Sequence, residues 1–147
     1  MSESLTTARL LGEAAEHRVA AEILLKGMNV FFPALDEGVD LITDKGVRIQ
    51  VKASGQEYSN TRGYTYPAYL FCTRRKKYIN SRDKTVRPKL DVSKIDFLIC
   101  WCVQHDWFFV IPASEVTQTM VNIGIGTVED GSSKYSEYLN NWELLRR

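Results

Sequence analysis

The sequence predicts an α/β fold with a central mixed β-sheet flanked by helices, on three observations. A helical apolar pattern covers residues 7–26, apolar runs of strand length follow it, and an amphipathic segment occupies 133–145. Helix and strand patterns that alternate along one chain are typical of α/β folds. A length of 147 residues favours one domain, so we expect 1–147 to form a single unit.

The first expected element is the helix over 7–26. Apolar residues recur in it at spacings of three and four, and Gly27 suits the left-handed position just after its end. Gly12 lies inside the helix, where glycine is costly, and this predicts a close approach by another backbone. The apolar positions are Ala8, Leu11, Ala15, Val19 and Ile23.

Strand patterns with turn signals follow the helix. We expect strands at 29–32, 39–43 and 47–53, the last two joined by a turn at 44–46 that ends in glycine. Residues 54–94 show no sustained period apart from a strand pattern at 68–72, so a basic inserted segment is expected there. The remaining elements are strands at 96–103 (apolar and central) and 107–111 with a tight turn at Asp106, a short helix at 113–121, an edge strand at 123–127 and a helix at 133–145.

Composition excludes several classes of protein. Hydrophobic residues make up 44% of the chain and charged residues 25%, which is ordinary for a globular protein and unlike a disordered one. The apolar runs are too short to span a membrane, and the first residues lack the pattern of a signal peptide, so no membrane partner is expected. The chain has three cysteines, an odd number, which favours the reducing cytoplasm over a disulfide framework.

The charge is unevenly distributed. The whole chain carries +1, but the segment 62–89 has nine basic residues and one acid, so it carries +8 and the rest carries −7. A cluster of basic residues interleaved with tyrosines is suited to binding a nucleic-acid backbone. The residues expected to contact DNA are Arg62, Arg74, Arg75, Lys76, Lys77, Arg82, Lys84 and Arg87.

The strongest functional pattern lies in the hairpin 39–53. If the turn places Thr43 opposite Val47, Asp40 lies opposite Gln50, and strand alternation puts Lys52 on the same face. The other face is apolar and consists of Val39, Leu41, Ile49 and Val51.

An acid, an amide and an ammonium in a row are suited to hydrolysis of a phosphodiester. Mg²⁺, with Mn²⁺ as a substitute, prefers carboxylate and carbonyl oxygens. We expect Asp40 as the principal ligand, with the side-chain oxygen of Gln50 and the backbone carbonyl of Val51 as further ligands. Lys52 then orients or deprotonates the attacking water.

These residues resemble the PD-(D/E)XK nuclease superfamily in its Q-x-K form. The resemblance covers residues 12–53, through Gly12 and Glu16, Gly27, the run Gly38-Val-Asp40 and the run Gln50-Val-Lys52. It is closest to Holliday-junction resolvases and to a group I intron homing endonuclease type. It implies a restriction-endonuclease-like core, a Mg²⁺-dependent endonuclease activity on DNA, a metal ligand at Glu16 and a catalytic role for all four polar residues.

The sequence departs from the common pattern at Val39, where a proline is usual, and at Gln50, which replaces an acid and weakens the attraction for a cation. The alternative function is a non-catalytic or attenuated nucleic-acid-binding module on the same fold. Glu13 is either a supporting acid or an exposed helix residue. Because cutting both strands needs two sites, we expect a homodimer or homotetramer, while homing, junction resolution and restriction or repair all stay open.

Overall fold

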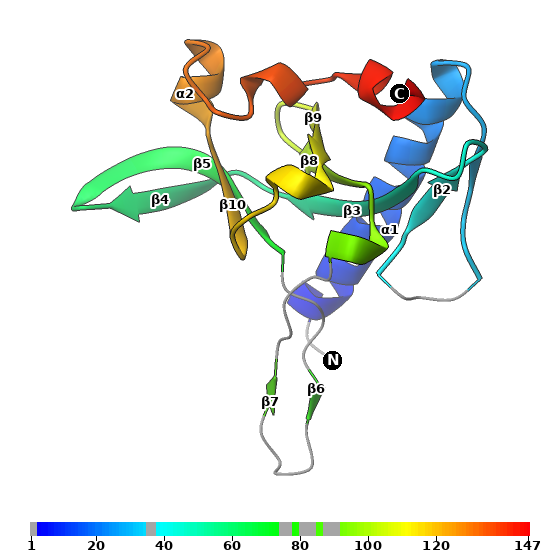
Figure 1. Cartoon of the computed structure of the whole chain (residues 1–147). Coiled ribbons are helices and arrows are strands. Elements are labelled where there is room, and N and C mark those ends of the chain that lie inside the picture. Colours follow the sequence, from blue (N-terminus) through cyan, green and yellow to red (C-terminus); the bar gives the residue numbers. More distant parts are fainter. Residues whose placement is uncertain (1–2, 35–37, 74–77, 80–84, 87–91) are drawn as a thin grey trace.

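The computed structural model describes residues 3–34, 38–73, 78–79, 85–86 and 92–147. A five-stranded sheet with the order β1-β2-β3-β8-β9 forms its centre, beside a three-stranded sheet with the order β10-β5-β4. Helix α1 (Glu3–Leu25) packs on one face of the large sheet, and the small sheet packs on the other (Figure 1). The expected mixed sheet is confirmed, and the second sheet is an addition that the sequence does not predict.

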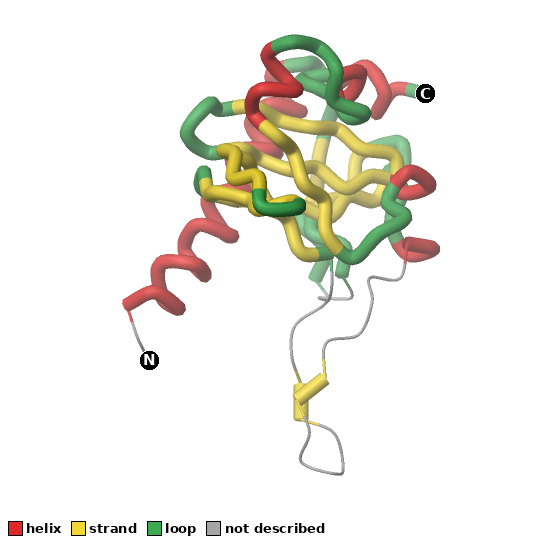
Figure 2. Tube along the Cα trace, turned by 90° about the vertical axis from the view of Figure 1, so that its left-hand side faces the viewer, coloured by secondary structure: helices red, strands yellow, loops and turns green. Residues whose placement is uncertain are grey.

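The helix α1 starts four residues earlier than expected and ends at Leu25. Its buried side chains face the large sheet, while its N-terminal half extends beyond the sheet (Figure 2). Gly27 follows the helix with φ 85°, as expected. The expectation for Gly12 is wrong, because no atom of the described residues beyond the adjacent residues and the helix's own backbone lies within 4 Å of the position that a Cβ would take there. Among the described residues, no helix is both long and apolar enough to cross a bilayer.

The large sheet contains the predicted hairpin. Strands β2 and β3 are antiparallel, with Gly46 at φ 82° in the turn between them, whereas β3 and β8 are parallel. Strands β8 and β9 are antiparallel and joined by a turn in which Asp106 has φ 52°. The bounds are β1 (Val30–Phe31), β2 (Leu41–Thr43), β3 (Arg48–Ser54), β8 (Phe97–Cys102) and β9 (Trp107–Pro112).

The small sheet shows more strand structure in 54–94 than the single short strand expected at 68–72. A long hairpin lies there, and its two turn residues, Arg62 and Gly63, have φ 54° and 79°. Positive φ at both positions matches the twist of a two-residue hairpin, but arginine is an unusual first residue for this turn. The strands are β4 (Glu57–Thr61), β5 (Tyr64–Cys72) and β10 (Met120–Gly124), and a separate pair is formed by β6 (Tyr78–Ile79) and β7 (Thr85–Val86).

The last third of the chain is less helical than expected. Asn140 adopts φ 51° and interrupts the segment 133–145. Its N–H donates to the carbonyl of Phe108 at 2.6 Å, and its side-chain oxygen accepts the Phe108 N–H at 3.1 Å. Pairing with β9 therefore replaces helical hydrogen bonds. The elements are η1 (Val92–Lys94), η2 (Ala113–Glu115), α2 (Ile125–Glu129), η3 (Ser136–Tyr138) and η4 (Trp142–Arg146), so the helix expected at 113–121 is a single turn and the edge strand comes earlier, at β10.

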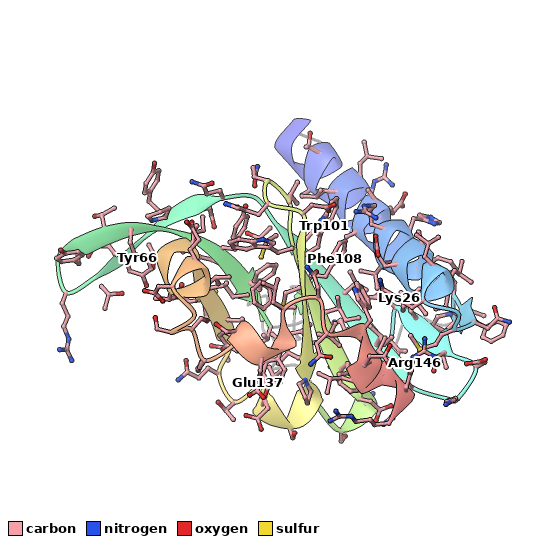
Figure 3. The ribbon with its side chains drawn as sticks, turned by 90° about the horizontal axis from the view of Figure 1, so that it is seen from above. Lys26, Tyr66, Trp101, Phe108, Glu137 and Arg146 are labelled. Atoms are coloured by element: carbon pink, nitrogen blue, oxygen red, sulfur yellow. The ribbon has the colours of Figure 1, made fainter. Side chains whose placement is uncertain are left out.

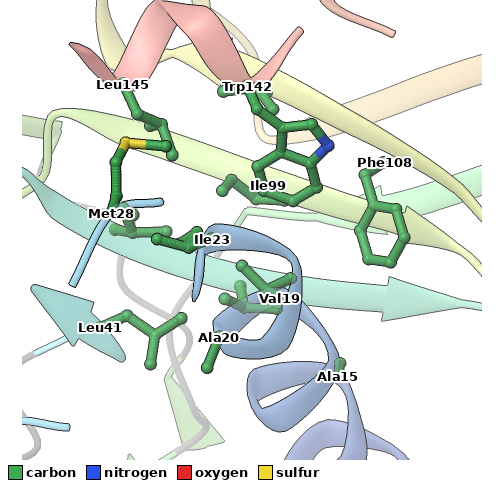
Figure 4. Packing of buried hydrophobic residues seen from close by; sticks show 13 residues of the cluster. Ala15, Val19, Ala20, Ile23, Met28, Leu41, Ile99, Phe108, Trp142 and Leu145 are labelled. Carbon is green, nitrogen blue, oxygen red and sulfur yellow. The ribbon is translucent and has the colours of Figure 1, made fainter. Parts of the chain in front are cut away.

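Two apolar clusters hold the layers together. In the first, Ala15, Val19 and Ile23 of α1 pack on Leu41 and Ile99 of the sheet (Figure 4). The end of the chain closes this cluster, where Arg146 donates a hydrogen bond to the carbonyl of Lys26 (Figure 3). The second cluster lies between the two sheets and includes Leu98, Cys100, Cys102, Phe109 and Ile111 from the large sheet and Tyr69, Phe71, Val121 and Ile123 from the small one.

Candidate active site

The predicted register of the β2–β3 hairpin is confirmed. Leu41 pairs with Ile49, and the N–H of Thr43 donates to the carbonyl of Val47 at 2.9 Å. Asp40 comes immediately before β2, where the regular pairing ends. This position places Asp40 beside the middle of β3.

The carboxylate of Asp40 is held against the backbone of β3. Its Oδ2 accepts the N–H of Val51 at 2.8 Å, and its own N–H donates to the carbonyl of Ile49 at 2.8 Å. These contacts lie on either side of Gln50 along the strand. A hydrogen bond from a backbone amide orients a carboxylate without neutralising its charge.

The same contacts explain why one prediction fails. Val39 was expected to share the apolar face of Leu41, but it packs against the second cluster, between the two sheets. The strand alternation is broken at Asp40, whose carboxylate turns toward Val51 instead of continuing the pleat.

Gln50 is the most unusual polar residue of the site. It is 8% exposed, and its Oε1 is buried with no hydrogen-bond partner among the described residues. An unsatisfied buried acceptor costs about 1–3 kcal/mol, so it requires an explanation. Gln50 pairs with Leu98 of β8, which belongs to the second cluster, so its side chain lies on the face of β3 opposite to α1.

Lys52 lies on the same face as Gln50 and is half-buried. It pairs with Cys100 of the parallel strand β8. Burial raises the pKa of the Cys100 thiol strongly, Cys102 raises it further, and the positive charge of Lys52 acts in the opposite direction. Lys52 therefore lies near the buried Cys100 thiol, in surroundings where charges interact more strongly than in water.

Glu16 comes from α1 and is half-buried. It lies one helical turn before Ala20, which packs in the same cluster as Leu41, the residue that follows Asp40. Glu13 belongs to the exposed surface instead, because its carboxylate pairs with Arg9 at 2.9 Å and both side chains are more than half exposed. Glu16 is therefore the partly buried acid of the two, and it comes from the helix that covers the Ile49 and Val51 face of β3, not the face of Gln50 and Lys52.

The donor set fits a hard cation. It combines the Asp40 carboxylate, the Gln50 amide oxygen and the Val51 carbonyl, all oxygen donors of the kind that Mg²⁺ prefers, whereas Glu16 lies on the helix that covers the opposite face of β3. The orphaned Gln50 Oε1 is an acceptor that a cation would satisfy. Within the described residues, no group of three or more His, Cys, Asp or Glu side chains forms a metal site, so the set depends on its amide and carbonyl oxygens.

A salt bridge that the sequence did not single out supports the site from one end of β3. Asp96 accepts the backbone N–H of Arg48 at 2.8 Å and pairs with its guanidinium at 3.3 Å. The hydrogen bonds from Arg48 and its charge lower the pKa of Asp96. The two residues are 48 apart in sequence, so spacing contains no signal of this contact.

The predicted DNA-contacting residues are only partly within the described structure. Arg62 is exposed at the tip of the β4–β5 hairpin, which extends away from the body of the protein (Figure 1). Tyr58 and Tyr64 on the same hairpin are 72% and 78% exposed. The other predicted contacts lie outside the described residues, namely Arg74, Arg75, Lys76, Lys77, Arg82, Lys84 and Arg87.

Comparison with solved structures places this arrangement in a known fold. A bacterial homing endonuclease, I-Ssp6803I, superposes with a TM-score of 0.73 at 22% sequence identity, over 93% of this chain and 91% of that chain. The protein therefore has the restriction-endonuclease-like fold of that enzyme. A search of curated proteins finds no significant match.

The family model for PD-(D/E)XK endonucleases matches residues 6–145. The chain belongs to this endonuclease family, whose reaction is hydrolysis of phosphodiester bonds. The match extends well beyond residues 12–53, which contain the motif, and includes the small sheet and the C-terminal turns.

Proposed function

We propose that this protein is a divalent-metal-dependent DNA endonuclease whose active site is formed by Asp40, Gln50, Val51, Lys52 and Glu16. One observation carries the proposal: the Asp40 carboxylate is fixed on the Val51 N–H beside a buried Gln50 oxygen that has no hydrogen-bond partner in the described part of the chain. A costly, unsatisfied acceptor next to an oriented carboxylate is typical of a site built for function.

The residues have distinct roles in this proposal. Asp40, the Gln50 oxygen and the Val51 carbonyl would hold Mg²⁺ or Mn²⁺, and Glu16 would contribute an acid from α1, on the other side of β3. When bound, the ion supplies a lower pKa for the attacking water and stabilisation of the charge on the phosphate. Lys52 orients that water and, through its positive charge, stabilises the negative charge that develops on the phosphate.

Gln50 has one negative charge fewer than the acid that is usual at this position, so the attraction for the ion is weaker. Burial partly offsets this loss, because the oxygen is already stripped of water and pre-oriented. A cation bound to the Gln50 Oε1 would also remove the cost of leaving this buried oxygen without a partner.

We propose DNA as the substrate because of the hairpin and the basic segment after it. A two-stranded ribbon fits the major groove, and Arg62, Tyr58 and Tyr64 lie exposed on the β4–β5 ribbon. The segment that follows β5 contains eight further basic residues up to position 89. Contacts from these cations to phosphates predict binding that weakens steeply with salt.

The decisive experiment is cleavage of supercoiled DNA, a four-way junction and a random-sequence duplex library in the presence of Mg²⁺. Asp40→Ala and Lys52→Ala should each lower the cleavage rate by at least about 100-fold, the size of effect seen when one catalytic electrostatic contact is removed. Asp44→Ala and Lys45→Ala are matched controls, because they change the same residue types at exposed positions of the same hairpin.

Cleavage that survives both active-site substitutions would contradict the proposal. DNA binding without cleavage, and without measurable Mg²⁺ or Mn²⁺ binding, would favour the non-catalytic module instead. Preference for the junction over the duplex library separates structure-specific cleavage from sequence-specific cleavage, which homing and restriction require.

A further inference from the structure

The solvent-facing side of α1 contains an apolar stripe with the spacing of a helix–helix seam. Its residues are separated by four, three, four and three positions, and all of them are exposed. This is the a/d pattern by which one helix packs along another. The stripe lies on a different face from Ala15, Val19 and Ile23, which are buried against the sheet. The stripe consists of Leu10, Ala14, His17, Ala21 and Leu24.

The exposure of the stripe is large for apolar side chains. Leu10 is 51% exposed and Leu24 is 53% exposed. Phe32 widens the patch at its centre, because its ring lies 5.1 Å from the ring of His17 and the residue is 50% exposed. Contiguous exposed apolar surface of this kind marks an interaction site.

The order of residues in the stripe identifies the partner. Read in either direction, the stripe is leucine, alanine, histidine, alanine, leucine, with His17 at the midpoint. A twofold axis through His17 brings Leu10 against the partner subunit's Leu24, and Leu24 against the partner subunit's Leu10. Such reciprocal contact is the defining property of a twofold interface between identical chains.

The charges beside the stripe also suit a second copy. Arg9 pairs with Glu13 at 2.9 Å, and Arg18 pairs with Glu22 at 3.0 Å and with Asp106 at 2.7 Å. Each arginine beside the stripe is therefore compensated by an acid, so a second copy would not bring unpaired arginines together. DNA, by contrast, would require unpaired cations on this face.

We propose that a second copy of this chain docks antiparallel along α1, with the twofold axis at His17, Leu10 packed on Leu24 across the interface, and the Phe32 rings flanking the axis. The alanines at 14 and 21 allow the two helices to approach closely. This interface goes beyond the nuclease proposal, and it would supply the second active site that cutting both strands needs.

The test measures molecular mass, by sedimentation or light scattering, across a range of protein concentrations. The wild-type protein should have at least twice the chain mass of 16.8 kDa. Leu10→Lys and Leu24→Lys should each halve the observed mass, because a buried lysine would face leucine. Both positions are exposed within one chain, so circular dichroism and the thermal midpoint should be unchanged.

Leu25→Lys is the matched control, because this leucine is 78% exposed on the same turn but lies outside the stripe, so its mass should equal that of the wild type. The double variant Leu10→Lys/Leu24→Glu should recover the wild-type mass through two cross-interface ion pairs, whereas Leu10→Lys/Leu24→Lys should not. Any one of four results would overturn the proposal. They are a wild-type monomer at high concentration, an unchanged mass for Leu24→Lys, a halved mass for Leu25→Lys, and no recovery of mass in the Leu10→Lys/Leu24→Glu variant. None of these measurements depends on cleavage, so they test the interface separately from the nuclease activity.

Discussion

The two faces of strand β3 differ sharply, although their residues alternate along a single run. On the face toward α1, Ile49 is fully buried and Val51 is 8% exposed, both inside the first apolar cluster. On the opposite face, Gln50 has an unsatisfied oxygen and Lys52 brings an ammonium close to the buried Cys100. One face stabilises the fold, and the other retains groups that destabilise it.

This contrast shows how the seven residues of β3 separate a core-forming face from a polar face. The strand is fixed in place by apolar burial on one side, so the other side can hold polar groups in costly positions. Substitutions on the two faces should therefore separate stability from metal binding.

The largest expected effect on stability is on the α1 face. Ile49→Ala should lower the free energy of unfolding by about 2–5 kcal/mol, because it leaves a cavity in a fully buried site. Lys52→Ala, on the other face, should change it by less than about 1 kcal/mol, because the ammonium contributes little packing. Urea denaturation of both variants measures the difference, and equal losses would break the distinction between the faces.

A smaller effect of opposite sign is expected at Gln50. Gln50→Leu should raise the free energy of unfolding by about 1 kcal/mol, since it removes a buried acceptor without a partner. The same change should abolish Mn²⁺ binding in calorimetry, and Gln50→Glu should strengthen it. Gln56→Leu is the control, because Gln56 is exposed just beyond β3 and neither property should change. A destabilised Gln50→Leu protein would show that the amide is satisfied in solution.

The smallest expected effect concerns pH and the ion pair at the start of β3. The pKa of Asp96 lies below its usual value of 3.8 because Arg48 hydrogen-bonds to it and carries positive charge. A depressed carboxyl pKa adds stability above the unfolded value, and this stability is lost as the pH falls through the folded pKa. Arg48→Met should therefore raise the pKa of Asp96 and weaken the dependence of stability on pH in this acid range.

An NMR titration of the Asp96 carboxyl carbon checks this shift. Asp130 provides an internal reference, because the pKa of that carboxyl is lowered by hydrogen bonds from Ser132 and does not involve Arg48. An unchanged Asp96 titration in the variant would mean that Arg48 is not its partner in solution. The contribution to stability is small, because both side chains are 42% exposed.

Local patterns were enough to predict much of the fold and the relative placement of the central site residues. The period of three and four residues marked α1, and the glycine of the 44–46 turn set the register that brings Asp40 to Gln50. Alternation then placed Gln50 and Lys52 together. Each of these predictions depends on interactions between residues close in sequence, which explains their success.

The features that sequence patterns missed depend on distant partners. Strand β10 joins β5 through the pairing of Val121 with Phe71, fifty residues apart, and no short-range pattern signals that sheet. The segment 133–145 has a helical apolar period, yet Asn140 exchanges helical bonds for two hydrogen bonds with Phe108. The long-range pairing outweighs the local preference in both places.

Sequence alone determined which residues of β3 share a face, because the pleat has a fixed geometry, but it did not predict the face of Val39. Only the tertiary structure decided what each face meets: α1 covers Ile49 and Val51, and the small sheet covers the face of Gln50 and Lys52. Likewise, only the packing of the described residues leaves the buried Gln50 oxygen without a hydrogen-bond partner. Burial depends on residues far apart in sequence, and burial turns an ordinary glutamine into the acceptor on which the proposed metal site rests.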